Sequence, residues 1–219
     1  MKLIFKYELD KELDNLKRGL ASKNHPGELP ELVLEMKEKG IDLDNDDECL
    51  AFFQEKLKDS EIDPDKRIES CNERWSSIAQ EAERRFKELF QTEDELGEIT
   101  AYLSVNRRCG YDIENKYFFV SFFKSNTNST AIHELLHFYT FKYLLPIFME
   151  RKITRNDYGD FKEALTFLMN EKFSDLLEGY EDTGYPKQAE LREFLIKKWS
   201  EDKDIYKLTE NVITDYFNK

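Results

Sequence analysis

Short stretches of alternating apolar and polar residues predict β-strands at the start and in the middle of the chain. In residues 1–8 (MKLIFKYE), apolar and charged side chains alternate with the period of a half-buried strand. Residues 98–105 and 116–123 are rich in β-branched and aromatic side chains, and Gly110 lies between them as a turn residue. We expect these two segments to form an antiparallel hairpin with a long connection.

Apolar residues at spacings of three and four predict amphipathic helices over most of the remaining chain. The clearest begins at Asp63-Pro64 and ends near Gln91, about seven turns at 3.6 residues per turn. Another follows the polar segment 125–130, which supplies N-cap candidates, and runs to Pro146. Further helices are predicted for residues 159–178, 188–199 and 202–217.

The order of these elements predicts an α+β fold in which helices predominate and a small antiparallel sheet precedes the C-terminal helices. The composition of the sequence changes near Gly97, where charged segments predicted to be helical are followed by predicted strands. We therefore expect an N-terminal helical lobe with a short leading strand at residues 1–96 and a second region at 97–219. The two regions can also form one compact domain.

The composition favours a folded protein with an acidic surface. Of the 219 residues, 40% are hydrophobic, 33 are Lys or Arg and 46 are Asp or Glu, which gives a formal net charge of -13 at pH 7. The acidic excess argues against broad nucleic-acid binding and against anionic membranes, because both depend on Lys and Arg. The N-terminal residues lack the apolar stretch of a secretion signal, and the three cysteines form no CxxC pair. We expect a cytoplasmic protein with reduced thiols.

Two of the three histidines lie in the sequence His133-Glu134-Leu135-Leu136-His137, inside a predicted helix. At 100° per residue, the two imidazoles point about 40° apart on one face of that helix, one turn from each other. Imidazoles at this spacing can hold one Zn²⁺ together with a third protein ligand and a water. Glu134 lies beside the first histidine, where a carboxylate can act as a general base toward that water.

The predicted strand, the polar turn and the HELLH helix together resemble the zincin metallopeptidases of the gluzincin type. The resemblance covers residues 98–178 and implies that 97–219 is a zincin-like metal-binding catalytic region. In that family a glutamate from a downstream helix is the third ligand, and an edge strand of the preceding sheet holds the substrate in an extended form. Residues 116–123 or their hairpin partner would be that strand. The longer metzincin motif is absent, because Thr140 and Tyr143 occupy its remaining positions.

Glu163 is the first of two candidates for the third ligand. On a helix it shares one strip with Thr166, Asn170 and Ser174, opposite the apolar face. A single carboxylate among small uncharged polar residues is unusual on a solvent-exposed helix face, where Lys and Glu predominate, and suits a lined cavity. The position four residues after Glu163 is Phe167, whereas the gluzincin pattern has an aspartate there.

Glu171 is the second candidate, because Asn170-Glu171 and Ser174-Asp175 match the gluzincin pattern N-E-x-x-S-D. By that resemblance, Asp175 would orient a ligand histidine. Two features disfavour Glu171: its long separation from His137 and the adjacent cation Lys172. On the composition of the helix face we favour Glu163.

These observations predict a zinc metallopeptidase that binds one Zn²⁺ through His133, His137 and Glu163 and uses Glu134 as its general base. The expected partner is a peptide or protein substrate, with no nucleic acid and no membrane, and the oligomeric state is open. Two alternatives remain. The first is a zincin-like protein that binds metal or a partner without turnover, and the second is a helical interaction protein whose HELLH sequence is accidental.

Overall fold

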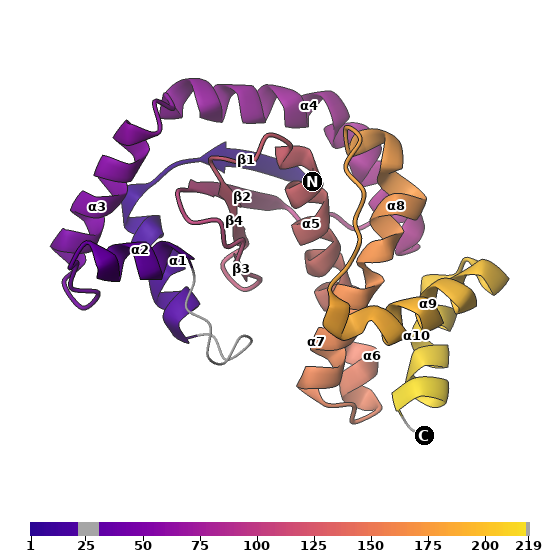
Figure 1. Cartoon of the computed structure of the whole chain (residues 1–219). Helices are drawn as coiled ribbons and strands as arrows, with labels where there is room; N and C mark the ends of the chain where they lie inside the picture. The colour runs from indigo at the N-terminus through magenta and orange to yellow at the C-terminus, as the bar shows by residue number, and fades with distance from the viewer. Residues whose placement is uncertain (22–30, 218–219) are drawn as a thin grey trace. The chain divides into compact units, whose positions relative to one another are not determined.

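The computed structural model of the chain describes residues 1–21 and 31–217 (Figure 1). Within these residues, the structure confirms an α+β fold in which helices predominate. It also confirms the leading strand at the N-terminus and the positions of the two central strands. The third histidine, His25, lies outside the described residues.

Within residues 1–21 and 31–217, four strands form one sheet in the order β1-β2-β4-β3. Its strands are β1 (Lys2–Lys6), β2 (Glu98–Ser104), β3 (Tyr111–Asp112) and β4 (Tyr117–Ser121). Strand β2 runs parallel to β1, with Ile99 opposite Leu3, and parallel to β4, with Ala101 opposite Phe118. Strand β3 runs antiparallel to β4. The sheet is therefore mixed.

The predicted antiparallel hairpin between residues 98–105 and 116–123 is wrong, because β2 and β4 pair in parallel. The connection 105–116 is long enough to include a return strand, β3, so the chain reverses direction twice before it reaches β4. The expectation of a substrate-binding edge strand at 116–123 or its partner is also wrong. Both β2 and β4 are inner strands, and the edges of the sheet are β1 and β3.

The chain forms two compact units, each built from segments that are distant in sequence. The sheet unit contains residues Lys2–Ser77 and Gly97–Thr130, and the helical unit contains Met1, Ile78–Leu96 and Ala131–Lys219. Two long helices, α4 (Pro64–Leu89) and α5 (Thr127–Tyr143), contribute residues to both units. The predicted N-terminal helical lobe at residues 1–96 and the predicted second region at residues 97–219 stay predictions.

The core of the sheet unit forms around β2 and β4. All five residues of β4 are buried, as expected for an inner strand that is covered on both faces. The other elements of this unit are α1 (Leu9–Ala21), α2 (Glu31–Glu38) and α3 (Asp46–Asp59). Helix α1 packs against α3 and against β2. In α4, Cys71 and Trp75 lie on the buried apolar face that the sequence pattern predicts.

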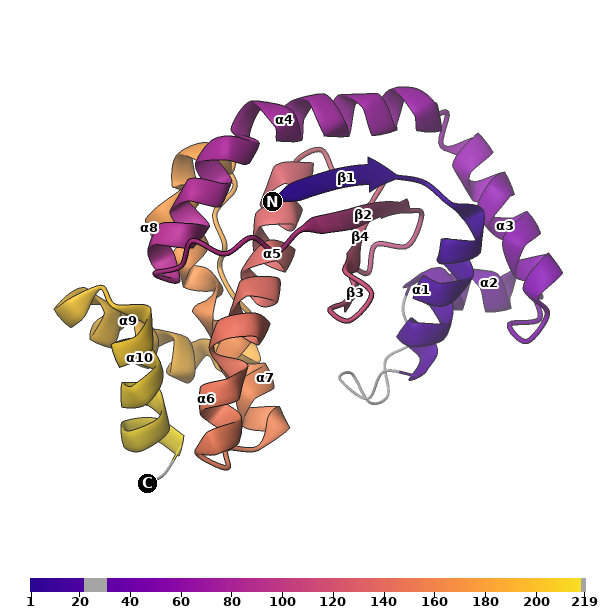
Figure 2. The same cartoon turned by 180° about the vertical axis from the view of Figure 1, so that it is seen from behind.

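The helical unit contains the remaining helices (Figure 2). They are α6 (Leu145–Glu150), α7 (Arg155–Ala164), α8 (Leu168–Phe173), α9 (Ala189–Asp202) and α10 (Ile205–Val212). Helix α9 packs against both α7 and α10. None of the helices in the described part of the chain has the length and apolar character that crossing a membrane requires.

The predicted continuous helix at 159–178 is in fact a series of short helices. Between α7 and α8 the chain tightens into a 3-10 turn, Leu165–Phe167, and α8 is followed by a second, Ser174–Leu176. The Thr166 hydroxyl donates a 2.8 Å hydrogen bond to the carbonyl oxygen of Glu163, which satisfies one carbonyl at the end of α7. Thr166 also binds side chains outside the helix, so its contacts favour a break in the helix at this position.

Candidate metal centre

Helix α5 carries the HELLH sequence and is held by a cap at its start and by apolar packing along its buried face. At its start, Asn126 accepts a 3.0 Å hydrogen bond from the Ser129 amide, so the predicted polar segment does supply the cap. Leu135, Leu136 and Tyr139 are fully buried. In the helical unit, the Tyr139 ring stacks on Phe86 of α4 with centroids 4.7 Å apart. This packing fixes the rotation of α5 and therefore the direction in which the histidines point.

The structure brings His133, His137 and Glu163 together. Oε2 of Glu163, on α7, lies 3.7 Å from Nε2 of His133 and 3.5 Å from Nε2 of His137. The ligand atoms of the three residues all lie within 4.8 Å of one another. The site is largely shielded from solvent, with His137 2% exposed and Glu163 24% exposed.

These distances fit a metal ion. A tetrahedral Zn²⁺ with bonds of about 2.1 Å separates its ligand atoms by about 3.4 Å, close to the two nitrogen–oxygen distances between the imidazoles and Glu163. Two imidazoles and one carboxylate are also the donor set of a catalytic zinc site with one position left for water. The donor types and their spacing are therefore both compatible with zinc.

The protonation states also suit metal binding. Burial, together with the neighbouring Lys162 and His133, lowers the pKa of His137 to about 3 in spite of the opposing effect of Glu163. Burial raises the pKa of Glu163, but the neighbouring His137, Lys162 and His133 outweigh burial and hold that pKa below its usual range. At neutral pH the site thus presents a neutral imidazole and an ionised carboxylate, as a metal requires.

Lys162 is a fourth residue at this site that sequence reasoning missed. Its ammonium group forms an ion pair with Oε1 of Glu163, and its side chain is only 12% exposed. The two oxygens of the Glu163 carboxylate are therefore used differently, because Oε2 faces the histidines while Oε1 faces the lysine. The available signal was the adjacency of Lys162 to Glu163 in the sequence, which parallels the Lys172–Glu171 pair.

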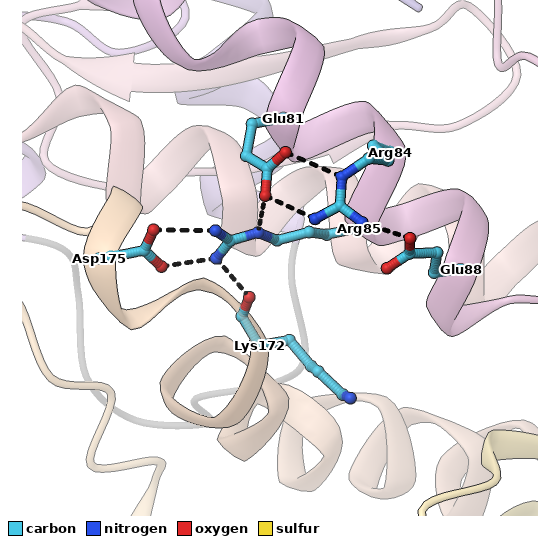
Figure 3. Close-up of polar contacts among 6 residues, drawn as sticks. All are labelled: Glu81, Arg84, Arg85, Glu88, Lys172 and Asp175. Atoms are coloured by element: carbon cyan, nitrogen blue, oxygen red, sulfur yellow. Dashed lines mark hydrogen bonds and ion pairs between the residues drawn. The ribbon is translucent and has the colours of Figure 1, made fainter.

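The rival ligand, Glu171, lies elsewhere in the helical unit. Its carboxylate forms an ion pair with Lys203 at 3.0 Å. Asp175 accepts two hydrogen bonds from the Arg85 guanidinium, at 2.5 and 2.8 Å, so it is engaged with α4 (Figure 3). Arg85 also donates to the Lys172 carbonyl at 2.8 Å. In this structure Asp175 therefore ties the end of α8 to α4, and the geometry favours Glu163 as the third ligand.

The polar strip that includes Glu163 anchors a loop. Asn170 makes two hydrogen bonds to the backbone of Asp182, at 2.8 and 2.9 Å, and the Thr166 hydroxyl oxygen lies 2.8 Å from a carboxylate oxygen of Asp182. The Arg192 guanidinium pairs with the same carboxylate at 2.8 Å and donates to the Asp182 carbonyl at 2.7 Å. Thr166 and Asn170 thus serve a buried network, where the sequence suggested a lined cavity.

Glu134, the predicted general base, is 3% exposed. It follows His133 directly, so helix geometry turns its side chain about 100° from that of His133. The four predicted site residues, His133, Glu134, His137 and Glu163, all belong to the helical unit. The metal-ligand and general-base roles remain predictions.

Comparison of this chain with models of protein families, with curated proteins and with solved structures finds no match.

Proposed function

We propose that the protein is a zinc-dependent metallohydrolase of the gluzincin type that hydrolyses peptide bonds in a peptide or protein substrate. The observation that carries this proposal is the approach of Oε2 of Glu163 to within 3.5 and 3.7 Å of the two histidine Nε2 atoms. The HELLH sequence by itself requires only a helix. A carboxylate from a different helix at metal-ligand spacing is an independent feature, which supports a centre built to hold an ion.

Each residue has a defined task in this proposal. His133 and His137 donate their Nε2 lone pairs, and Glu163 donates Oε2, to one Zn²⁺. The bound ion would supply Lewis-acid polarisation of the scissile carbonyl and would make a coordinated water more acidic. Glu134 removes a proton from the attacking water as the oxygen–carbon bond forms, and then delivers that proton to the amine nitrogen as the carbon–nitrogen bond breaks.

The metal part of the proposal is tested by zinc content and affinity. Purified wild-type protein should hold one zinc per chain. Glu163→Gln should weaken zinc binding at least about tenfold, because an amide oxygen carries no charge and is a poor zinc ligand. The matched control is Glu171→Gln, which removes a carboxylate paired with Lys203 and should leave zinc affinity unchanged. Wild-type protein without zinc, or equal losses in both variants, would contradict the proposed ligand set.

The catalytic part is tested with Glu134→Gln. This variant should retain zinc with wild-type affinity and lose hydrolysis of a mixed peptide library by a factor of about 10² or more, because the general base is gone. Mass spectrometry of the library before and after incubation measures the cleavage. If Glu134→Gln cleaves as fast as the wild type, Glu134 is not the base.

The burial of Glu134 favours a second candidate function, metal binding without turnover. A general base must reach a water in the substrate-bound state, and this side chain is 3% exposed. A wild-type protein that holds zinc and cleaves no member of a broad library would support this candidate. Cleavage that requires both zinc and Glu134 would exclude it.

A further inference from the structure

The position of Lys162 carries an inference that rests on the proposed zinc site and deepens it. We propose that Lys162 weakens zinc binding, because it holds Oε1 of Glu163 away from the metal position and places a positive charge beside the three ligands. Lys162 thus acts as a positioning residue that keeps Glu163 a single-atom ligand.

The ion pair between Lys162 and Glu163 involves Oε1 of the carboxylate. The ammonium group pairs with Oε1, while Oε2 is the oxygen that faces both histidine Nε2 atoms. A carboxylate can bind a metal through one oxygen or through both. With Oε1 occupied by a partly buried cation, Glu163 offers one oxygen, and a four-coordinate site with a position for water is favoured over a closed one.

The charge of Lys162 acts in the same direction as its contact. Once zinc is bound, the donor set of two imidazoles and one carboxylate has a charge of -1, because a metal-bound imidazole is neutral, and the adjacent ammonium offsets this charge. The Lys162 side chain is 12% exposed, so solvent screens it incompletely. A positive charge in contact with a ligand carboxylate repels a divalent ion, and at an effective dielectric constant of about 20, after a discount for screening, this repulsion lowers affinity at least about tenfold.

Loss of the lysine should therefore tighten zinc binding, which is the opposite of the effect expected from damage to a structural residue. A packing or folding defect would weaken the site, because His133 and Glu163 belong to different helices and must be held together. The sign of the change thus separates the proposed role from a merely structural one.

The experiment is a competition titration of zinc against a chromophoric chelator, with the full-length protein and four variants. Lys162→Met removes the charge and the hydrogen bond, and Lys162→Gln removes the charge alone. Lys162→Arg keeps both. The matched control is Lys172→Met. This lysine is also adjacent to a glutamate, Glu171, in the sequence, but its Nζ lies over the Trp199 ring, 5.5 Å from the centroid.

We expect Lys162→Met and Lys162→Gln to bind zinc at least about tenfold more tightly than the wild type, and Lys162→Arg and Lys172→Met to match it within about threefold. If Lys162→Met does not fold, Lys162→Gln decides the question. Neutral variants that bind zinc with wild-type or lower affinity would overturn the inference and leave the proposed function intact. A wild-type protein that binds no zinc would instead refute the proposed function, and with it this inference.

Discussion

Glu12 offers a quantitative test of the fold, because it is a buried acid that nothing in the local sequence distinguishes. It lies in α1, in a segment rich in charged residues, yet it is only 2% exposed. The Ser104 hydroxyl donates to its Oε2 at 2.6 Å, and the Val105 amide donates to its Oε1 at 2.8 Å. Both partners belong to the end of β2 or the residue after it. Glu12 therefore connects α1 to the sheet.

Burial raises the pKa of Glu12 to about 7, although its hydrogen bonds to Ser104 and Val105 act to lower it. Compared with the ordinary value of 4.5, this raised pKa makes ionisation of Glu12 in the folded protein less favourable by about 3 kcal/mol. Because the pKa is higher in the folded state, the native protein binds the proton more tightly than the unfolded chain does. The contribution of Glu12 to stability is therefore full below about pH 4.5 and is lost as the pH rises through about 7.

The assay is urea unfolding of the wild type and of Glu12→Gln at several pH values from 5 to 8. A comparison of two proteins is needed because His137 titrates in the opposite sense. Its pKa is lowered to about 3, so its contribution to stability is present above about pH 6.5 and is lost as the pH falls. His137 is present in both proteins and cancels in the difference.

Relative to the wild type, Glu12→Gln should gain roughly 2–3 kcal/mol of unfolding free energy between pH 5 and pH 8, because the wild type alone must ionise a buried group. The matched control is Glu98→Gln on β2, whose exposed carboxyl has its pKa lowered by Lys2 and titrates below this window. A difference between wild type and Glu12→Gln that is constant across the range would refute the reasoning.

Other predictions concern the helical unit. Gly184→Ala should destabilise the protein by about 1–3 kcal/mol in thermal or urea unfolding, because Gly184 has φ +68° and a Cβ there would lie 2.9 Å from Cδ of the anchored Arg192 side chain. The control is Gly159→Ala on α7, where the new Cβ would meet no neighbouring atom within 4 Å, and it should leave stability unchanged or raise it by up to about 1 kcal/mol. An equal loss of stability in the two variants would contradict the strain and close contact inferred at Gly184. Phe86→Ala should cost about 3–5 kcal/mol, since its fully buried ring stacks on Tyr139, and a loss below about 1 kcal/mol would exclude this packing. Removal of zinc by EDTA should lower the melting temperature, because the ion binds only the folded state, and an unchanged melting temperature would contradict the metal site.

Local pattern sufficed for the positions of the main elements. Alternation and β-branched composition located β1, β2 and β4, and the spacing of apolar residues located α4 and α5. These patterns report which face of a strand or helix is apolar, and burial of that face is what makes the element form. The same reasoning located His133 and His137 on one helix face, because residues four apart are neighbours on any helix.

Strand pairing and the choice of the third ligand depend on contacts between residues that are distant in sequence. Parallel pairing of β2 and β4 requires the return strand β3, a two-residue element with little local signal. Glu163 and Glu171 both lie on helices with polar surroundings, and only the packing of α7 brings one of them to the histidines while the other pairs with Lys203. Glu12 and Lys162 are similar cases, since a charged side chain in a charged segment gives no sign of burial. The charge and protonation of this site are therefore properties of the folded chain, because burial and neighbouring charges act through space.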